Sequence, residues 1–306
     1  MMAEEKMPVA GQAETIMPSL QRVLAPNPSP MTYWGTNTYI LGDHDVVVID
    51  PGPNDESHLV ALVRILAGRR VDRILVTHSH LDHSGLAGAL STKTNAPVIA
   101  FGDSGAGRST IMTDLIAGGL TTGGEGVDHG FQPDKYLGDG AMISGSWGKI
   151  EAIHTPGHMA NHLCFRWGDV VFTGDHVMGW ASSLISPPDG DLTEFMKSCH
   201  RLTEISAKLF LPGHGGTVDD PTDRLRWLIE HRYAREAQIL SVLSRSTLTI
   251  SEITDSLYRD LAPGLRRVAQ RNIFAHLIDL VQRQKIAADP GINFDAKYYI
   301  IGTSDG

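Results

Sequence analysis

Residues 77–83, THSHLDH, place four possible metal ligands within six positions: His78, His80, Asp82 and His83. Three imidazoles and a carboxylate cannot all be ordinary core residues, because each would need a hydrogen-bonding partner once it is buried. Imidazole nitrogen and carboxylate oxygen are ligands that suit zinc, and iron or manganese can occupy such sites. The segment therefore predicts a metal site; a surface histidine-rich loop is the alternative.

One such loop cannot complete the coordination of two metals, so more distant ligands are expected. Three candidates follow apolar, strand-like runs and lie in tight turns that contain glycine: His158 in TPGH, Asp175 in FTGD and His214 in LPGH. One histidine or aspartate at such a place is more often structural. All three together indicate a common site.

Strand-like and helical segments alternate before residue 221, which indicates an α/β fold. The clearest strands are the two arms of a hairpin within 35–53 and the runs at 73–77, 97–100, 149–153, 162–167, 169–173 and 209–211. Helices are expected at 57–67 and 84–90. Residues 102–140 are rich in glycine and weakly periodic, so we expect a long loop there, which is a candidate cover for the active site.

The chain divides into three parts: a flexible tail over 1–20, a catalytic domain over 21–220 and a small domain over 221–306. Helices are expected in the last part at 222–243, 250–260 and 264–285, followed by a hairpin, which together resemble a winged-helix module. Residues 222–285 carry 11 basic and seven acidic side chains, although the whole chain has a net charge of −9. A solvated helical surface or a surface that faces nucleic acid explains this segregation.

The apolar runs, the first 20 residues and the cysteines indicate where in the cell the protein is expected. No apolar run approaches the roughly 20 residues that a membrane helix needs, and the first 20 residues lack the features of a secretory signal. We therefore expect a cytoplasmic protein without a membrane partner. The two cysteines, Cys164 and Cys199, are expected to be reduced core residues.

The ligand residues, in this order, closely resemble the metallo-beta-lactamase superfamily over roughly residues 32–220. The resemblance implies a four-layered αββα sandwich with metals at one edge of its two sheets. By position, His78, His80 and His158 would hold the first metal, with Asp82, His83 and His214 on the second and Asp175 between them. Asp50 would orient a ligand, and His154 and His162 are further candidates for that role.

Two divalent metals, zinc by preference, would share a hydroxide that attacks the substrate. Asp82 is the candidate catalytic residue because it would also orient this hydroxide. Two dications with two carboxylates leave the site positively charged, which suits an anionic substrate such as a phosphodiester; ester, thioester and lactone hydrolysis also fit.

The segments HRYAREAQI, TISEI, AQRNIFAHL and QRQKI resemble the winged-helix tail of the beta-lactamase-like endoribonucleases. This favours cleavage of single-stranded RNA, with Arg266, Arg267 and Arg271 at the phosphate backbone. The tail could equally pack on the catalytic domain or form a homodimer contact.

Three alternatives stand beside RNA cleavage. The first is a glyoxalase-II-like thioesterase or another small-molecule acyl hydrolase, since that group shares the ligand set. A secreted beta-lactamase is disfavoured by the Asp82-His83 pair, which stands in place of a cysteine-containing pattern. A metal-sensing regulator that binds DNA is the non-enzymatic alternative.

Overall fold

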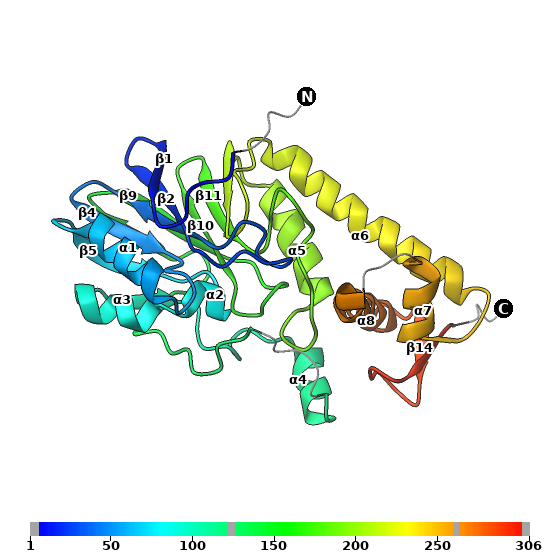
Figure 1. The fold of residues 1–306 in the computed structure, drawn as a ribbon. Helices are drawn as coiled ribbons and strands as arrows, with labels where there is room; N and C mark the ends of the chain where they lie inside the picture. The colour runs from blue at the N-terminus through cyan, green and yellow to red at the C-terminus, as the bar shows by residue number, and fades with distance from the viewer. Residues whose placement is uncertain (1–5, 121–125, 260–262, 302–306) are drawn as a thin grey trace.

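The computed structural model describes residues 6–120, 126–259 and 263–301, and it contains two β-sheets packed face to face (Figure 1). The seven strands of the first sheet follow chain order: β1 (Ala13–Met17), β2 (Leu20–Leu24), β3 (Asn37–Leu41), β4 (Asp45–Ile49), β5 (Arg70–Leu75), β6 (Val98–Ala100) and β7 (Lys135–Tyr136). The second sheet is ordered β12 (Leu209–Pro212), β11 (Val170–Gly174), β10 (Leu163–Trp167), β9 (Gly148–His154) and β8 (Met142–Gly145).

Helices cover the outer face of each sheet. On the first sheet they are α1 (Glu56–Leu66) and α3 (Ala87–Thr94); on the second they are α5 (Leu192–Thr203) and the start of α6 (Pro221–Leu243). A third apolar core fills the space between the sheets, where Tyr39 packs edge-on against Phe172. These layers confirm the four-layered αββα sandwich.

The strand directions bring several chain segments to one edge of the sandwich. β4 and β5 are parallel in the first sheet, and β11 and β12 are parallel in the second. β9 runs in the same direction as β11 because each is antiparallel to β10. The turns that follow β5, β9, β11 and β12 carry the predicted ligands, so strand topology explains why these distant residues meet.

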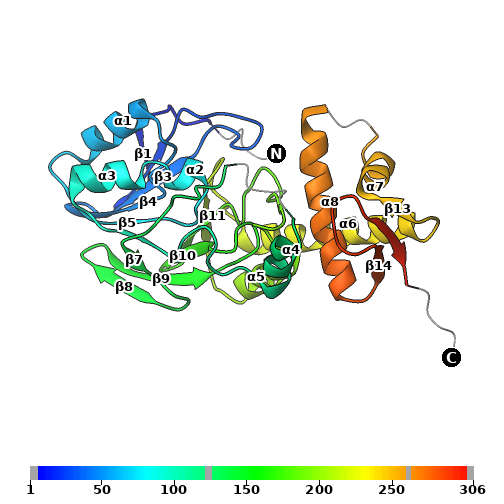
Figure 2. The ribbon, with the colours of Figure 1, turned by 90° about the horizontal axis from the view of Figure 1, so that it is seen from below.

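The C-terminal part forms a smaller unit with its own apolar core. Its elements are α7 (Ile250–Leu257), a short 3-10 helix (Pro263–Leu265), α8 (Arg266–Gln282), and a three-stranded antiparallel sheet ordered β13 (Leu248–Thr249), β15 (Lys297–Ile300) and β14 (Ile286–Asp289). A capping box between Thr249 and Glu252 begins α7. The predicted winged-helix architecture is confirmed, and α6 links it to the sandwich (Figures 1 and 2).

Two sequence-based expectations need correction. The flexible tail expected over 1–20 is wrong from Ala13 onward, because β1 pairs with β2 at the edge of the first sheet. An edge strand with one exposed side needs few apolar residues, so its mixed composition concealed it. The long loop expected over 102–140 is wrong at 110–117, because these residues form the helix α4 (Thr110–Ala117), whose Met112 packs into the C-terminal core. Of the same stretch, residues 121–125 lie outside the described residues.

The structure also bears on the membrane question. Among the helices in the described ranges, none is long and apolar enough to cross a bilayer.

Candidate active site

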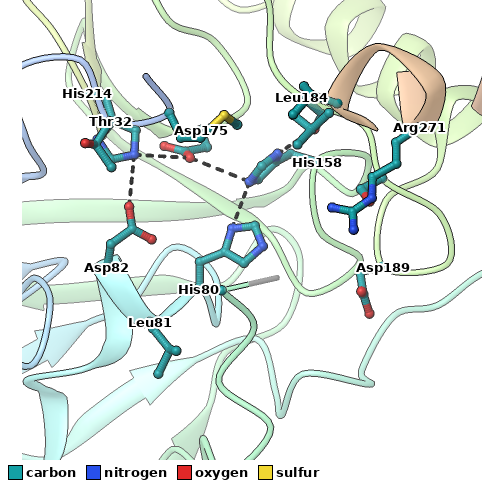
Figure 3. Close-up of a pocket in the computed structure, with 14 residues that line it drawn as sticks. Thr32, His80, Leu81, Asp82, His158, Asp175, Leu184, Asp189, His214 and Arg271 are labelled. Carbon is teal, nitrogen blue, oxygen red and sulfur yellow. Dashed lines mark hydrogen bonds and ion pairs between the residues drawn. The ribbon is translucent and has the colours of Figure 1, made fainter. Parts of the chain in front are cut away.

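The seven predicted ligands lie together in two groups. The first group is His78, His80, His158 and Asp175, and the second group is Asp82, His83 and His214. Within each group the potential ligand atoms all lie within 4.8 Å of one another. Figure 3 shows His80, Asp82, His158, Asp175 and His214 pointing toward a shared centre.

Ring nitrogens of the histidines face one another at short distances. His80 Nδ1 lies 3.0 Å from both His78 Nε2 and His158 Nε2, and His83 Nε2 lies 3.3 Å from His214 Nε2. Facing lone pairs repel unless a proton or a cation lies between them. Such an arrangement fits metal ligands better than a histidine cluster in an ordinary core.

The outer nitrogens of two ligands donate to backbone carbonyl groups. His158 Nδ1 donates to the Leu184 carbonyl at 2.7 Å, and His214 Nδ1 donates to the Gly35 carbonyl at 3.0 Å. Each bond places the ring proton on Nδ1 and leaves a lone pair on Nε2 directed at the centre. Metal-bound histidines are typically oriented in this way.

Asp50 organises the loop that carries the histidine cluster. Its carboxylate accepts bonds from the Thr77 backbone N–H at 2.7 Å, the Thr77 hydroxyl at 2.8 Å and His83 Nδ1 at 2.9 Å. The Thr77 hydroxyl oxygen in turn lies 3.0 Å from His78 Nδ1. Asp50 thereby contacts one ligand directly and reaches a second through Thr77.

Asp175 lies between the two groups. Oδ1 is 3.3 Å from His83 Nε2, while Oδ2 is 3.4 Å from His214 Nε2 and 3.6 Å from His158 Nε2. Oδ1 is buried and has no hydrogen-bond partner among the described residues. A buried carboxylate oxygen without a donor is costly, and a cation would satisfy it. The donor set and this orphaned oxygen fit a binuclear centre of divalent metals.

The charges of the site are unevenly divided between the groups. Burial and the neighbouring His158 lower the pKa of His80 to about 3. Burial alone would lower the pKa of His214, but the charges of Asp175 and Asp82 raise it to about 10. Without metal, the carboxylates therefore hold a proton on the second group and none on the first.

Glycine is required where the turns approach the ligands. A Cβ at Gly213 would lie 2.5 Å from His83 Cε1 and 2.6 Å from Asp175 Oδ1, closer than carbon atoms tolerate. This explains the glycine immediately before His214.

A cavity of about 330 Å³ opens onto both groups. Beyond the ligands, much of its wall is apolar, with contributions from Met31, Leu81, Leu184 and Val268. Arg271 of α8 lines the same cavity and is buried.

The other two arginines predicted to contact nucleic acid lie elsewhere. Arg266 forms an ion pair with Asp255 at the surface, and Arg267 is exposed on α8. The structure therefore separates Arg271 from the pair with which it was grouped.

Comparison with known proteins places this site in a family. Residues 31–214 match the metallo-beta-lactamase superfamily. The chain belongs to this superfamily. Residues 249–292 match the beta-lactamase associated winged helix domain, so the family assignment extends to the C-terminal unit.

Two relatives of this protein align with nearly the whole chain. The beta-lactamase-like protein 2 homolog of Drosophila melanogaster is 28% identical, over 92% of this chain and 94% of that protein. The atrochrysone carboxyl ACP thioesterase of Aspergillus fumigatus is 26% identical, over 95% of this chain and 88% of that protein.

A solved structure shares the complete fold. The beta-lactamase domain protein of Burkholderia ambifaria superposes with a TM-score of 0.80 at 22% identity, over 97% of this chain and 96% of that one. The protein is thus a metallo-beta-lactamase-fold hydrolase with a binuclear His/Asp site.

The two further histidines named from the sequence lie differently. His162 stacks on His78 with ring centroids 5.1 Å apart, and its Nδ1 lies 2.9 Å from the Thr155 hydroxyl. His154 instead stacks on Phe101, and its Nε2 lies 2.9 Å from the Ala160 carbonyl. Only His162 of this pair has a described contact with a candidate ligand.

Sequence reasoning missed a short segment, 183–185, that we call the strap. Its Leu184 carbonyl accepts the bond from His158, while Arg232 of α6 donates to the Ser183 carbonyl. Asn272 of α8 accepts a 3.2 Å bond from the Ile185 backbone N–H. The linking helix α6 and the C-terminal unit therefore hold the strap that orients His158. A contact made through a backbone carbonyl leaves no residue-type signal in the sequence.

Proposed function

We propose that this protein hydrolyses acyl thioesters of small molecules to an acid and a thiol. The observation that carries the proposal is the partly apolar cavity that opens directly onto the binuclear site. Its volume of about 330 Å³ lies at the lower end of the range for small-molecule pockets. The side chains of Met31, Leu184 and Val268 offer an acyl group a surface that excludes water.

Similarity to a thioesterase supports the same reaction. The Aspergillus fumigatus relative, named for thioester hydrolysis, aligns over 95% of this chain, including the C-terminal unit. The winged helix is therefore compatible with acyl hydrolysis and does not by itself favour nucleic acid.

The chain's residues account for metal binding and proton transfer. His78, His80 and His158 would hold one divalent cation, Asp82, His83 and His214 the other, and Asp175 both. When bound, these cations lower the pKa of water and polarise the thioester carbonyl. Zinc is the proposed metal, with manganese and iron as alternatives.

Asp82 is placed to act on the attacking water. It lines the cavity, and its Oδ2 lies 3.2 Å from His214 Nε2 and accepts a 3.3 Å bond from the Thr36 hydroxyl. Burial would raise the pKa of Asp82, but the charges of His83 and His214 lower it below its usual range. The ionised carboxylate can take a proton from water as the C–O bond forms and the C–S bond breaks, and that proton then neutralises the released thiolate.

Cleavage of single-stranded RNA, the leading expectation from the sequence, is supported less well. Arg266 is already paired with Asp255, and Arg271 lines the cavity instead of an open surface. The cytoplasmic location and the homodimer expected from the sequence stay predictions.

The two reactions can be separated with one preparation. The zinc-loaded and manganese-loaded proteins are given S-lactoylglutathione, a panel of N-acetylcysteamine thioesters, and labelled single-stranded RNA. We expect thiol release that His80→Ala abolishes, with intact RNA. RNA cleavage without thiol release would overturn the proposal.

A further inference from the structure

A second cavity, of about 210 Å³, lies where the sandwich meets the C-terminal unit. It shares none of its described lining residues with the cavity at the metal centre. Apolar side chains of α5, including Leu192 and Met196, form part of its wall. The rest of the wall comes mainly from α6 and α8 and carries the charged side chains Arg232, Glu236, Asp279 and Arg283.

Arg232 brings a buried positive charge to this second cavity. It is 4% exposed, and its contacts are with neutral groups: the Ser183 carbonyl, the Asn272 side chain and the Phe195 ring. Within the described ranges no carboxylate pairs with it, and its buried Nε has no hydrogen-bond partner. Burial lowers the pKa of Arg232 to about 10. A buried charge without an opposite charge is costly, so an anion in the cavity would stabilise this arginine.

The opposite imbalance occurs one helical turn further along α6. One Arg283 nitrogen, Nη2, lies 2.6 Å from Glu236 Oε2 and 2.6 Å from Asp279 Oδ2, so a single guanidinium faces two carboxylates. Lys197 does not offset the second carboxylate, because it pairs with Glu194 at 2.8 Å. This group therefore keeps one excess negative charge, while the buried arginine keeps one excess positive charge. The cavity is neutral as a whole but has two oppositely charged ends.

His276 adds an unpartnered polar group to the same cavity. It is 2% exposed, lines the cavity from α8, and its buried Nε2 has no hydrogen-bond partner among the residues that the structure describes. Burial, with the nearby charge of Arg232, holds the pKa of His276 well below its usual value, so the ring is neutral at pH 7. A neutral imidazole has one donor and one acceptor nitrogen, and it can bond to a charged ligand without adding charge.

We propose that the second cavity binds a small amino acid, with its carboxylate toward Arg232 and its ammonium group toward Glu236 and Asp279. A zwitterion carries one charge of each sign and so matches both imbalances. An anion or a cation alone would leave one of them in place. The volume is below the usual range for drug-sized ligands, which fits a molecule of this size. This site is independent of the proposed thioester hydrolysis.

Two methionine methyl groups can report separately on the two cavities. Met196 lines the second cavity, and Met31 lines the cavity at the metal centre. Metal-loaded protein with ¹³C-labelled methionine methyl groups is titrated, by NMR, with glycine, L-alanine and 4-aminobutyrate. Propionate and ethylamine, which resemble L-alanine but each lack one charged group, are titrated in parallel. Met196→Leu and Met31→Leu assign the two signals, and an amino acid that bound only to the metals would move the Met31 signal alone.

Variants test each end of the cavity separately. Arg232→Met removes the positive end, and Glu236→Gln removes a carboxylate from the negative end. Arg226→Met and Glu230→Gln are the matched controls, because both residues are exposed on α6 and do not line the cavity. Arg232 also holds the strap, so Glu236→Gln provides a test that leaves the strap contact in place.

We expect at least one of the three amino acids to move the Met196 signal saturably, with an affinity about 10-fold or more above that of propionate and ethylamine. Arg232→Met and Glu236→Gln should each weaken this binding about 10-fold, and the two control variants should not. The inference is overturned if no amino acid moves the Met196 signal, if only Met31 responds, or if the single-charge compounds bind equally well. Unchanged affinity in Glu236→Gln would overturn it as well.

Discussion

The two ligand groups are braced by different parts of the molecule. In the second group, His83 is held by Asp50 and His214 by the Gly35 carbonyl, both within the sandwich. In the first group, His158 is held by Leu184 of the strap, which α6 and α8 fasten. One half of the centre therefore depends on the sandwich alone, whereas the other half also depends on the C-terminal unit.

This difference gives the C-terminal unit a role that does not require nucleic acid. Arg232 and Asn272 hold the strap, and Arg271 of the same α8 lines the cavity. The C-terminal unit therefore contributes both to the bracing of His158 and to the wall of the cavity. Variants that act on one group but not the other test whether the two halves are separable.

The largest effect is expected where the groups meet. Asp175→Ala removes the carboxylate that lies between them, so both metals should be lost and activity should fall on the order of 10³-fold, as several kcal/mol of stabilisation disappears. Metal content by plasma mass spectrometry checks this. The matched control is Asp189→Asn, another buried aspartate of the cavity, which should retain two metals. Retention of both metals by Asp175→Ala would show that Asp175 is no ligand.

Loss of the contact between Asp50 and His83 should weaken metal binding by the second group. Asp50→Asn keeps the shape but removes the charge that orients His83, and loss of such an outer partner typically costs 10- to 100-fold in metal affinity. Anomalous diffraction from crystals grown at limiting zinc gives the occupancy of each position. Occupancy should fall more at the second group, where Asp50 contacts His83 directly, than at the first, where it reaches His78 only through Thr77.

Loss of the contact that holds the strap should instead weaken metal binding by the first group, by a somewhat smaller factor. Asn272→Ala frees the Ile185 N–H and loosens the Leu184 carbonyl, so affinity should fall about tenfold at the first group only. The control is Arg226→Met, an exposed residue of α6 paired with Asp223. Equal losses at both positions would mean that the halves are not separately braced.

The smallest perturbation is a change of pH. Asp175 and Asp82 raise the pKa of His214 to about 10, so a metal entering the second group must displace a proton at neutral pH. Its affinity should rise about tenfold per unit between pH 6 and 8. The pKa of His80 is lowered to about 3, so the first group has no such competitor there. Zinc competition titrations at three pH values should give two different slopes; identical slopes would contradict the assignment.

Sequence reasoning was effective where function lies at strand ends. His158, Asp175 and His214 were selected because each follows an apolar run and a glycine, and parallel strands bring such turns to one edge. Runs of consecutive apolar residues likewise predicted the strands β4 and β5. The apolar runs and the glycine-containing turns can be read from short stretches of sequence, and a few parallel strand pairings bring these turns together.

Other features depended on packing that local patterns do not encode. The helix α5 was missed although Asp191 caps it and Leu192, Phe195, Cys199 and Leu202 form its buried face. Arg271 was grouped with its neighbours because the sequence does not reveal how α8 is turned toward the sandwich. The helix orientation is set by contacts such as Thr193 with Asp279, which join distant segments.

The most direct test of the proposed binuclear thioesterase activity is a metal titration of the metal-free protein. Thiol release from the N-acetylcysteamine thioester that the protein turns over fastest is followed against equivalents of zinc, and bound metal is counted in the same samples. We expect activity to rise until two equivalents per chain are bound. Full activity with one bound zinc, or no thiol release with two, would contradict the account.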